Sequence, residues 1–344
     1  MLTRIKTFLR RMRSFNFKRL WMLVSETAEE SGRNKIALLI DMIWCAVYYG
    51  TGYLDYRVFG FAWIRDRAKR KTFMTMNHNL QLVRNVNDKA YDAIFTDKAR
   101  FNTRFSEFIG RQWLDLRNSD FPEFEAFIRD KKFIFAKVTD GFGGVGVERL
   151  CVSQYDNKKD LYDTLLDHRQ FIIEERIPQH PEMDRLCPTS INTLRITTVL
   201  AKGQAHVMYA LVRMGNGTKA VDNISSGGMY CRVGEDGVIH VPAFCDKTGM
   251  CYDTHPSTGT KLIGFSIPFF KESVELVKKA AHVVPQIRYV GWDVAITPDG
   301  PVLVEGNTIP GYDMCQNYYH QGEQHEGILP RFRAVFGENL SDFS

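Results

Sequence analysis

The pattern of apolar and polar residues changes along the chain. Up to about residue 70 it predicts helices, and from Met74 to about Arg129 it predicts several short ones. One of these is "FPEFEAFIRD", where Pro122 suits the first turn of a helix. β-Rich segments begin at residue 132 and alternate with turns almost to the end of the chain. This order predicts an α+β protein with a helical N-terminal extension.

The β-rich segments fall into two groups. The first contains "KFIFAKV" (132–138), "VERLCV" (147–152) and "QFIIEERI" (170–177), with the helix-like "NKKDLYDTLLDH" between the last two. The Pro- and Asp-containing "QHPEMDRLCPTS" predicts a loop. In the second group, turn residues separate "INTLRITTVLA", "QAHVMYALVRMG", "GGMYCRV" and "GVIHVPA". This spacing predicts an antiparallel sheet in a second, larger lobe.

The last part of the pattern is one helix and two strands. Residues 271–284 predict a helix with one apolar face, formed by Val274, Val277, Ala281 and Val284. The strands "YVGWDVAI" and "PVLVEGN" follow, joined by the turn "TPDG" (297–300).

These changes predict five regions. They are a helical basic region (1–70), a second helical region (71–130), a small lobe with a glycine-rich loop (131–180), a large lobe (181–332) and a C-terminal tail (333–344).

The most apolar run, "IALLIDMIWCAVYY" (36–49), contains Asp41 and is shorter than the roughly 20 residues that cross a bilayer. We therefore expect a buried helix. The run lies too far into the chain, and lacks a small-residue cleavage site, to be a secretory signal.

Composition narrows the class of protein. The chain has 344 residues, of which 44% are apolar, enough for two or three domains that share a large core. Its seven cysteines are scattered and include no C-x-x-C pair, so neither a disulfide framework nor a zinc site is indicated. A reducing cytoplasm is the expected location.

The net charge of +5 is concentrated at the N-terminus, where the first nineteen residues contain no acid. The basic residues there are Arg4, Lys6, Arg10, Arg11, Arg13, Lys18 and Arg19. Apolar residues interleave with them at helical spacing, so residues 1–20 suit a helix that lies on an anionic membrane surface. The alternative is a solvated helix whose stripe of apolar residues packs on the rest of the protein. Nucleic acid is not expected, because the chain has no second basic stripe.

A glycine-rich segment, "KVTDGFGGVGVERL", matches G-x-G-x-x-G at Gly141, Gly143 and Gly146. A dinucleotide-binding loop would open a helix after the last glycine, but a strand is predicted there. A protein kinase would also need H-R-D and D-F-G, which the chain lacks. The remaining interpretation is a hairpin whose loop folds over polyphosphate, with Lys137 directed at a phosphate. A surface hairpin with a solvated lysine is the alternative.

Oxygen-bearing side chains gather near the end of the chain. Asp293 ends one strand, and Glu305 and Asn307 point to one side of the next, because side chains alternate along a strand. The turn between the strands brings Asp293 to the same face. Two carboxylates and an amide oxygen suit Mg²⁺, which completes its shell with water and phosphate. The alternative is that Asp293 and Asn307 only cap local turns.

Six ordered blocks then give the chain a resemblance to the ATP-grasp superfamily, and within it to the sugar-transfer-associated ATP-grasp proteins. They span about residues 51–332 and are "DKARFNTRF", "FIFAKVTDGFGGVGV", "FIIEERIPQHP", "SINTLRITT", "AVDNISSGGMYCRV" and "GWDVAITPDGPVLVEGNTIPG". The resemblance implies the ATP-grasp fold, in which two α+β lobes clamp ATP, with Mg²⁺ on Asp293, Glu305 and Asn307. The nucleotide-binding residues that it implies are Lys98, Lys137, Gly141, Gly143, Gly144, Gly146, Glu174, Glu175, Ile177, Asn192, Asp222 and Asn223.

Within this set the resemblance implies Lys137 on phosphate and the Glu174–Ile177 segment on adenine and ribose. It also implies a catalytic role for Lys137 and for Arg195, whose guanidinium would clamp the γ-phosphate. A structural arginine paired with an acid is the alternative for Arg195, and an Asx-turn is the alternative for Asp222 and Asn223. Some ATP-grasp ligases carry an arginine just before the first metal aspartate. Here Gly291 and Trp292 occupy those positions.

The chemistry that the resemblance implies is carboxylate–amine ligation. A substrate carboxylate attacks the γ-phosphate of ATP, and an amine captures the acyl phosphate, with a cell-surface polysaccharide or envelope precursor as the expected substrate. One alternative is a phosphotransferase that acts on a sugar or lipid hydroxyl. Another is a nucleotide-binding partner of sugar transferases without activity of its own. The expected partners are a carboxylate, an amine and an anionic membrane surface at the inner face of the membrane.

Overall fold

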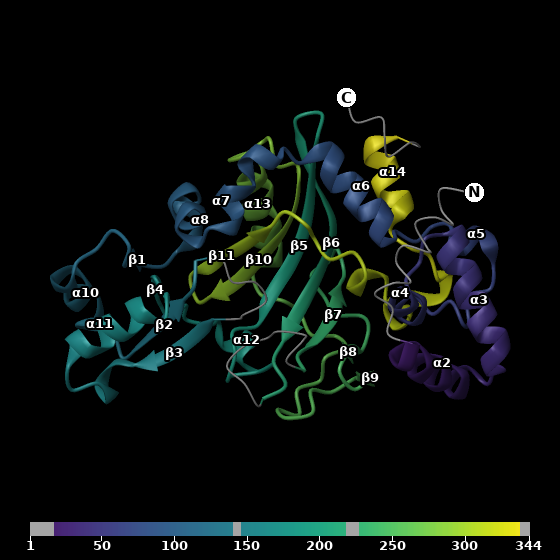
Figure 1. The fold of residues 1–344 in the computed structure, drawn as a ribbon, viewed down its shortest axis with the longest axis horizontal. Helices are drawn as coiled ribbons and strands as arrows, with labels where there is room; N and C mark the ends of the chain where they lie inside the picture. Colours follow the sequence, from purple (N-terminus) through teal and green to yellow (C-terminus); the bar gives the residue numbers. More distant parts are fainter. Residues whose placement is uncertain (1–16, 140–145, 218–226, 338–344) are drawn as a thin grey trace. The chain divides into compact units, whose positions relative to one another are not determined.

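The computed structural model describes residues 17–139, 146–217 and 227–337. The chain divides into two compact units (Figure 1). We call residues Met1–Val86 together with Ile309–Ser344 the helical unit, and Asn87–Thr308 the two-lobe unit.

The helical unit is built from short helices, as the sequence predicts up to residue 70. They are α2 (Phe17–Ser31), α3 (Lys35–Tyr48), α4 (Tyr53–Val58), α5 (Arg67–Arg70), α6 (Met76–Val86), η4 (Met314–Gln316), η5 (Tyr318–His320), η6 (Gly322–Gln324) and α14 (Leu329–Phe336). Asn34 starts α3 by accepting hydrogen bonds from the backbone N–H groups of Ile36 and Ala37. Phe59, Phe61 and Phe73 pack together in the core, with ring centroids 4.9–5.6 Å apart.

Residues 36–49 are predicted to form a buried helix. The helix is confirmed, but its burial is wrong, because only one side of the helix is buried. Leu38, Met42 and Cys45 face the core of the unit. The opposite side of α3 faces solvent, and Ile40 is 62% exposed. An apolar run without helical alternation cannot show which of its sides is covered. In the part of the chain that the structure describes, no helix is both long and apolar enough to cross a membrane.

Asp41 connects α3 to the rest of the helical unit. Its carboxylate accepts hydrogen bonds from Arg70 (2.7 and 2.8 Å), Tyr56 (2.7 Å) and Arg33 (3.2 Å). Burial alone would raise the pKa of Asp41, but the hydrogen bonds from Arg70 and Tyr56 outweigh it and lower the pKa to about 2. The carboxylate therefore stabilises the fold above about pH 4, and this contribution is lost as the pH falls toward 2.

We expect Asp41→Asn to lower the free energy of unfolding at neutral pH by about 2 kcal/mol, because Arg70 loses its charged acceptor. Urea unfolding at pH 7 and at several values between pH 4 and pH 2 would measure this, and the variant should show a flatter acid dependence. Glu29→Gln, at an exposed position of α2, is the control. Equal stability of Asp41→Asn and the unmodified chain at pH 7 would contradict the prediction.

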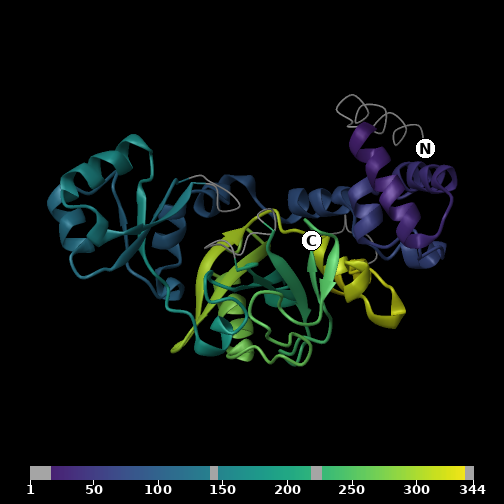
Figure 2. The same ribbon diagram turned by 90° about the horizontal axis from the view of Figure 1, so that it is seen from below.

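The two-lobe unit begins with η1 (Lys89–Tyr91), α7 (Asp92–Thr96), α8 (Lys98–Arg104) and α9 (Ser106–Ile109). Its small lobe contains β1 (Trp113–Asp115), α10 (Phe121–Ile128), β2 (Phe133–Lys137), β3 (Val147–Cys151), η2 (Val152–Gln154), α11 (Lys158–Asp167) and β4 (Ile172–Glu175). The strands form an antiparallel sheet in the order β1-β4-β2-β3. Phe124 and Ile128 of α10 and Leu161 and Leu165 of α11 pack on this sheet. Figure 2 shows the ribbon of this lobe from a second direction.

The large lobe contains α12 (Pro181–Asp184), β5 (Thr193–Ala201), β6 (Gln204–Met214), β7 (Met229–Val233), β8 (Ala243–Cys245), β9 (Met250–Tyr252), α13 (Phe270–Ala281), β10 (Tyr289–Thr297) and β11 (Gly300–Asn307). Its seven-stranded sheet has the order β11-β10-β5-β6-β7-β8-β9. The antiparallel sheet, the helix near 271–284 and the final hairpin are confirmed.

Side-chain alternation divides the large sheet into an apolar and a polar face. Leu194, Ile196, Val212, Trp292 and Val294 point into the main core, together with Phe95 and Phe105 of the helices before the small lobe. Alternate residues of the same strands point the other way. They are Arg195 on β5, Arg213 on β6, Asp293 on β10 and Glu305 on β11, so the second face of the sheet gathers the charged groups.

Some local predictions are wrong. "GVIHVPA" is not a strand, because a tight turn holds its start: the N–H of Gly234 donates to the carbonyl of Val238, and Gly237 has a φ of +80°. The strand β8 begins only at Ala243. The loop predicted after residue 178 contains the short helix α12, whose first turn His180 caps by accepting from the N–H of Glu182. The strand β1 was not predicted.

Candidate active site

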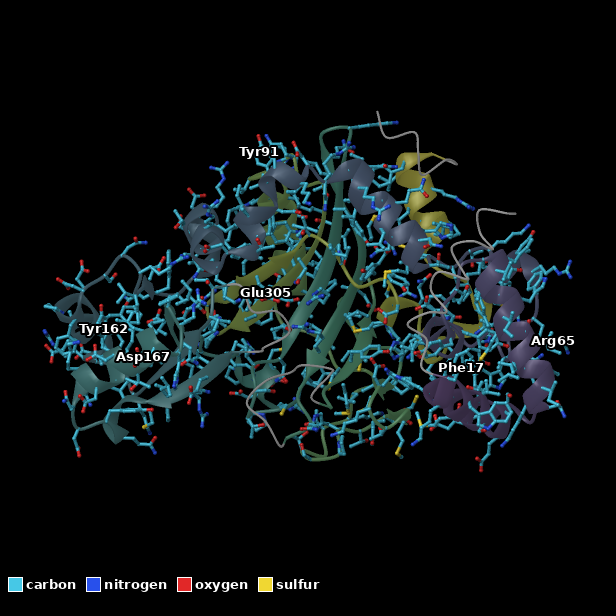
Figure 3. The ribbon with its side chains drawn as sticks, viewed as in Figure 1. Phe17, Arg65, Tyr91, Tyr162, Asp167 and Glu305 are labelled. Carbon is cyan, nitrogen blue, oxygen red and sulfur yellow. The ribbon has the colours of Figure 1, made fainter. Side chains whose placement is uncertain are left out.

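A cavity in the two-lobe unit is lined by residues from β2, β3 and β4 of the small lobe and from β5, β6, β10 and β11 of the large lobe. The predicted site residues that line it are Lys98, Lys137, Glu174, Glu175, Ile177, Asp293 and Glu305. Side chains from segments nearly 200 residues apart in sequence therefore meet at one place. Figure 3 labels Glu305 among them.

Asp293 and Glu305 lie directly opposite each other on the paired strands β10 and β11. Only Pro298 and Asp299 separate the two strands, and this tight turn fixes the register as far as Val294 and Leu303. A β-bulge between Asp293 and Val294 then shifts the register by one residue, so that Asp293 faces Glu305 and not Val304. Asn307 is two residues beyond Glu305 on the same side, and its side-chain amide lies 3.4 Å from Oε1 of Glu305. The convergence of Asp293, Glu305 and Asn307 expected from alternation is present.

Asp293 is buried and is held by two arginines. Arg195 forms a bidentate ion pair with it, in which Nη2 lies 2.9 Å from Oδ2. Nη2 of Arg213 lies 3.0 Å from the same Oδ2 and 2.9 Å from the hydroxyl oxygen of Thr193. Burial alone would raise the pKa of Asp293, but the charges of Arg195 and Arg213 outweigh it and hold the pKa below its ordinary value.

The electrostatics of Glu305 are opposite. Burial first, and then the negative charge of Asp293, raise the pKa of the Glu305 carboxyl. A second negative charge is therefore costly at this place until a positive charge arrives. Two carboxylates and an amide oxygen match the donor set of Mg²⁺, whose remaining ligands are water and phosphate. Within the described ranges, the structure has no cluster of three or more His, Cys, Asp or Glu side chains suited to a metal ion.

A buried ion-pair network fixes Lys137. Its Nζ lies 2.5 Å from Oε2 of Glu174, and Nε of Arg111 lies 2.9 Å from the same oxygen. Asn102 donates to Oε1 of Glu174 at 2.9 Å. Burial alone would raise the pKa of Glu174, but the charges of Arg111 and Lys137 hold it far below its ordinary value. Glu174 therefore acts as an anchor for two cations, and its main contacts are with protein.

Arg111 also contacts the large lobe. Its guanidinium donates to the backbone carbonyls of Leu303 (2.6 Å) and Val304 (3.1 Å) on β11. Since Glu174 lies on β4, one buried side chain bonds strands of both lobes.

The hairpin of the small lobe is present as predicted, with Lys137 paired to Val147 at the end next to its loop. Gly146 has a φ of +73°, and a Cβ there would lie 2.7 Å from a methyl carbon of Val138, so only glycine fits this position. Gly141, Gly143 and Gly144 lie outside the described residues, and so do Asp222 and Asn223.

Four described residues of the predicted site do not line the cavity, namely Gly146, Asn192, Arg195 and Asn307. Asn192 is buried and its side chain donates to the carbonyls of Met183 and Cys187, which fixes the connection before β5. Arg195 is held by Asp293 and is not among the residues that line the cavity.

Sequence reasoning did not find Arg111, Asn102 and Arg213. Arg213 could have been found from the sequence, because it is a charged residue in the otherwise apolar stretch "VMYALVRM". It follows Tyr209 and Leu211 at spacings of two residues, so the alternation of side chains puts all three on the same side of the strand. Arg111 and Asn102 had none, since their partners lie 63 and 72 residues away in sequence.

The comparisons with known proteins can now be reported. Similar solved structures include ATP-grasp ligase PsnB complexed with minimal precursor, with 14% identity, a TM-score of 0.44, and coverage of 74% of this chain and 64% of that one. D-cycloserine synthetase DcsG has 15% identity, a TM-score of 0.43 and coverage of 74% and 73%. The D-alanine-D-alanine ligase from Coxiella burnetii has 10% identity, a TM-score of 0.39 and coverage of 75% and 57%. The chain thus spans less than two thirds of PsnB and of the Coxiella ligase.

No curated protein matches the chain. The model of the family described as sugar-transfer associated ATP-grasp matches residues 151–332, which is more than half of the sequence. This match covers β4 to β11 and confirms the expected α+β ATP-grasp fold. The chain belongs to the sugar-transfer associated ATP-grasp family.

Proposed function

We propose that the protein is an ATP- and Mg²⁺-dependent carboxylate–amine ligase that acts through an acyl phosphate. The observation that carries the proposal is the pair Asp293 and Glu305, which face the same cavity as Lys98 and Lys137. Oxygen ligands on one side and ammonium groups on the other suit a bound magnesium triphosphate. Membership of an ATP-grasp family supports the choice of ATP.

The described lining of the cavity contains no histidine and no cysteine, so it offers neither a Ser–His nor a Cys–His pair of nucleophile and base. Phosphoryl transfer to a substrate carboxylate needs positioning and neutralisation of charge more than a protein nucleophile. When bound at Asp293, Glu305 and Asn307, Mg²⁺ would neutralise phosphate oxygens. Lys137, held in place by Glu174, and Lys98 would bind phosphate as point charges.

We assign the clamp on the transferring phosphoryl group to Arg213 in addition to Arg195. Arg213 lines the cavity, whereas Arg195 holds Asp293. A cation bound by Asp293 would compete with its two ion pairs, and the Arg213 guanidinium already borders the cavity. The Glu174–Ile177 segment remains the proposed nucleotide contact, with Glu175 and Ile177 facing the cavity and Phe135 and Val147 supplying apolar surface for adenine.

The family description supports a substrate from the synthesis of a cell-surface polysaccharide or of another envelope precursor. Such a reaction fits a cytoplasmic protein at the inner face of the membrane, with residues 1–20 as a basic contact to anionic lipid. If deletion of residues 1–20 leaves vesicle binding unchanged, this contact is not made by that segment.

The test is ADP release from Mg·ATP in the presence of a panel of sugar acids and amino acids, with products identified by mass. A ligase should release ADP well above background only when a carboxylate and an amine are both present, and the product should be an amide. A stable phosphate ester formed from a hydroxyl substrate would establish a phosphotransferase instead. Tight Mg·ATP binding without turnover on any member of the panel would favour a non-catalytic nucleotide-binding partner.

A further inference from the structure

The solvent side of α3 is apolar over most of the helix. Ile36, Ile40 and Ile43 are 64%, 62% and 44% exposed, and Tyr48, near the C-terminal end, is 44% exposed. The isoleucines are spaced by four and three residues, so they project from one side of the helix. We call Ile36, Ile40 and Ile43 the outer α3 face, and Tyr48 lies to one side of it.

No charge interrupts the outer α3 face. The one acidic residue of α3, Asp41, points to the opposite side, where Arg70 and Arg33 hold it. Single exposed apolar residues are common on proteins, but a contiguous exposed patch marks a surface that binds something. The helix is therefore apolar on both sides, and the structure of the helical unit explains only the inner one.

Basic and aromatic groups border the outer α3 face. Lys35 is the first residue of the helix and is exposed. The guanidinium of Arg67 lies 5.3 Å from the ring centroid of Trp44, and Trp44 stacks on Tyr48 at 4.8 Å. Arg65, labelled in Figure 3, lies two residues before Arg67 on the same exposed segment.

The start of α2, in the same unit, has similar chemistry. Phe17 and Trp21 are 61% and 51% exposed, and Lys18 and Arg19 are exposed between them. The preceding sixteen residues carry basic side chains and no acid. Exposed apolar tips, interfacial aromatic rings and basic residues without acids between them match the headgroup region of an anionic bilayer.

We infer that the outer α3 face inserts into the interfacial layer of an anionic membrane, with α3 parallel to the surface and with Lys35, Arg65 and Arg67 on lipid phosphates. The charges favour this occupant over a protein groove, because basic groups border the apolar side chains and the acidic Asp41 points inward. Asp66, the acid between Arg65 and Arg67, caps α5 by accepting from the backbone N–H groups of Ala68 and Lys69. The inference concerns the helical unit and does not depend on the reaction of the two-lobe unit.

The experiment is sedimentation of the full-length chain with vesicles of phosphatidylcholine alone or mixed equally with phosphatidylglycerol. We expect binding to the mixed vesicles, and a loss of about tenfold or more in apparent affinity for Ile40→Asp and for the double variant Ile36→Asp/Ile40→Asp. Ile309→Asp is the matched control, because Ile309 is 60% exposed, lies outside α3 and receives the same charge. Since Ile40 is mostly exposed, the thermal midpoint of Ile40→Asp should equal that of the unmodified chain.

Several outcomes would overturn the inference. Equal losses in Ile40→Asp and Ile309→Asp would show an effect of charge alone. Normal vesicle binding by Ile40→Asp, together with a change from dimer to monomer in light scattering, would assign the face to a second copy of the chain. If Ile40→Asp reduces binding only after residues 1–16 are deleted, that segment covers the face in the intact protein. Strong binding to pure phosphatidylcholine would remove the role of the basic residues.

Discussion

Glu305→Gln should reduce ATP turnover about a thousandfold or more, because it removes one of the two carboxylates proposed to hold Mg²⁺. The reason for choosing Glu305 over Asp293 is structural. Asp293 neutralises Arg195 and Arg213, so replacing it would leave buried guanidinium groups unpaired and would weaken the fold. Burial and Asp293 raise the pKa of Glu305, so the folded protein gains little from a charge at that position.

The measurement is the rate of ADP release at saturating ATP over a range of Mg²⁺ concentrations. Glu305→Gln should need more Mg²⁺ than the unmodified chain, while its unfolding midpoint without nucleotide stays the same. Asp299→Asn, in the turn at the other end of the β10–β11 hairpin, is the control and should retain turnover. Full turnover by Glu305→Gln at low Mg²⁺ would exclude Glu305 as a metal ligand.

The second large effect is expected on stability. Glu174→Gln should lower the free energy of unfolding by about 3–5 kcal/mol, because it removes the carboxylate that pairs with both Arg111 and Lys137. The guanidinium of Arg111 and the ammonium of Lys137 would then lack a counter-charge. The site is buried, since Glu174 is only 3% exposed.

Urea unfolding with Glu175→Gln as the control would measure the effect. Glu175 is the next residue on β4 and accepts one hydrogen bond, from the N–H of Gln112 at 2.7 Å, so we expect a loss of about 1 kcal/mol or less. If Glu174 instead acts mainly on adenine and ribose, Glu174→Gln would weaken ATP binding and unfold at the same urea concentration as the unmodified chain.

The parts of the fold that the sequence predicts well depend on local pattern. The hairpin around Lys137, the helix α13 and the pairing of β10 with β11 follow from short turns and from side-chain period, which nearby residues determine. Asp293, Glu305 and Asn307 were found together for that reason. Their meeting needs the tight turn and also the β-bulge between Asp293 and Val294, of which the sequence pattern predicts only the turn.

The parts that could not be predicted depend on contacts between distant segments. Arg111 has no neighbouring residue in the sequence that identifies Glu174 as its partner. The same limit applies to α3, since an uninterrupted apolar run shows that the helix is hydrophobic but not which side another element covers. The resemblance to ATP-grasp proteins implies that Glu174 contacts the nucleotide, but it does not predict the ion pair of Glu174 with Lys137.

The position of Arg111 has a mechanical consequence for the two lobes. Its guanidinium is bonded at once to Glu174 on β4 and to the carbonyls of Leu303 and Val304 on β11. A swing of the small lobe that kept these bonds would have its fulcrum at this side chain. Groups close to the fulcrum, such as Glu174 and the Lys137 ammonium paired with it, would move little during such a swing.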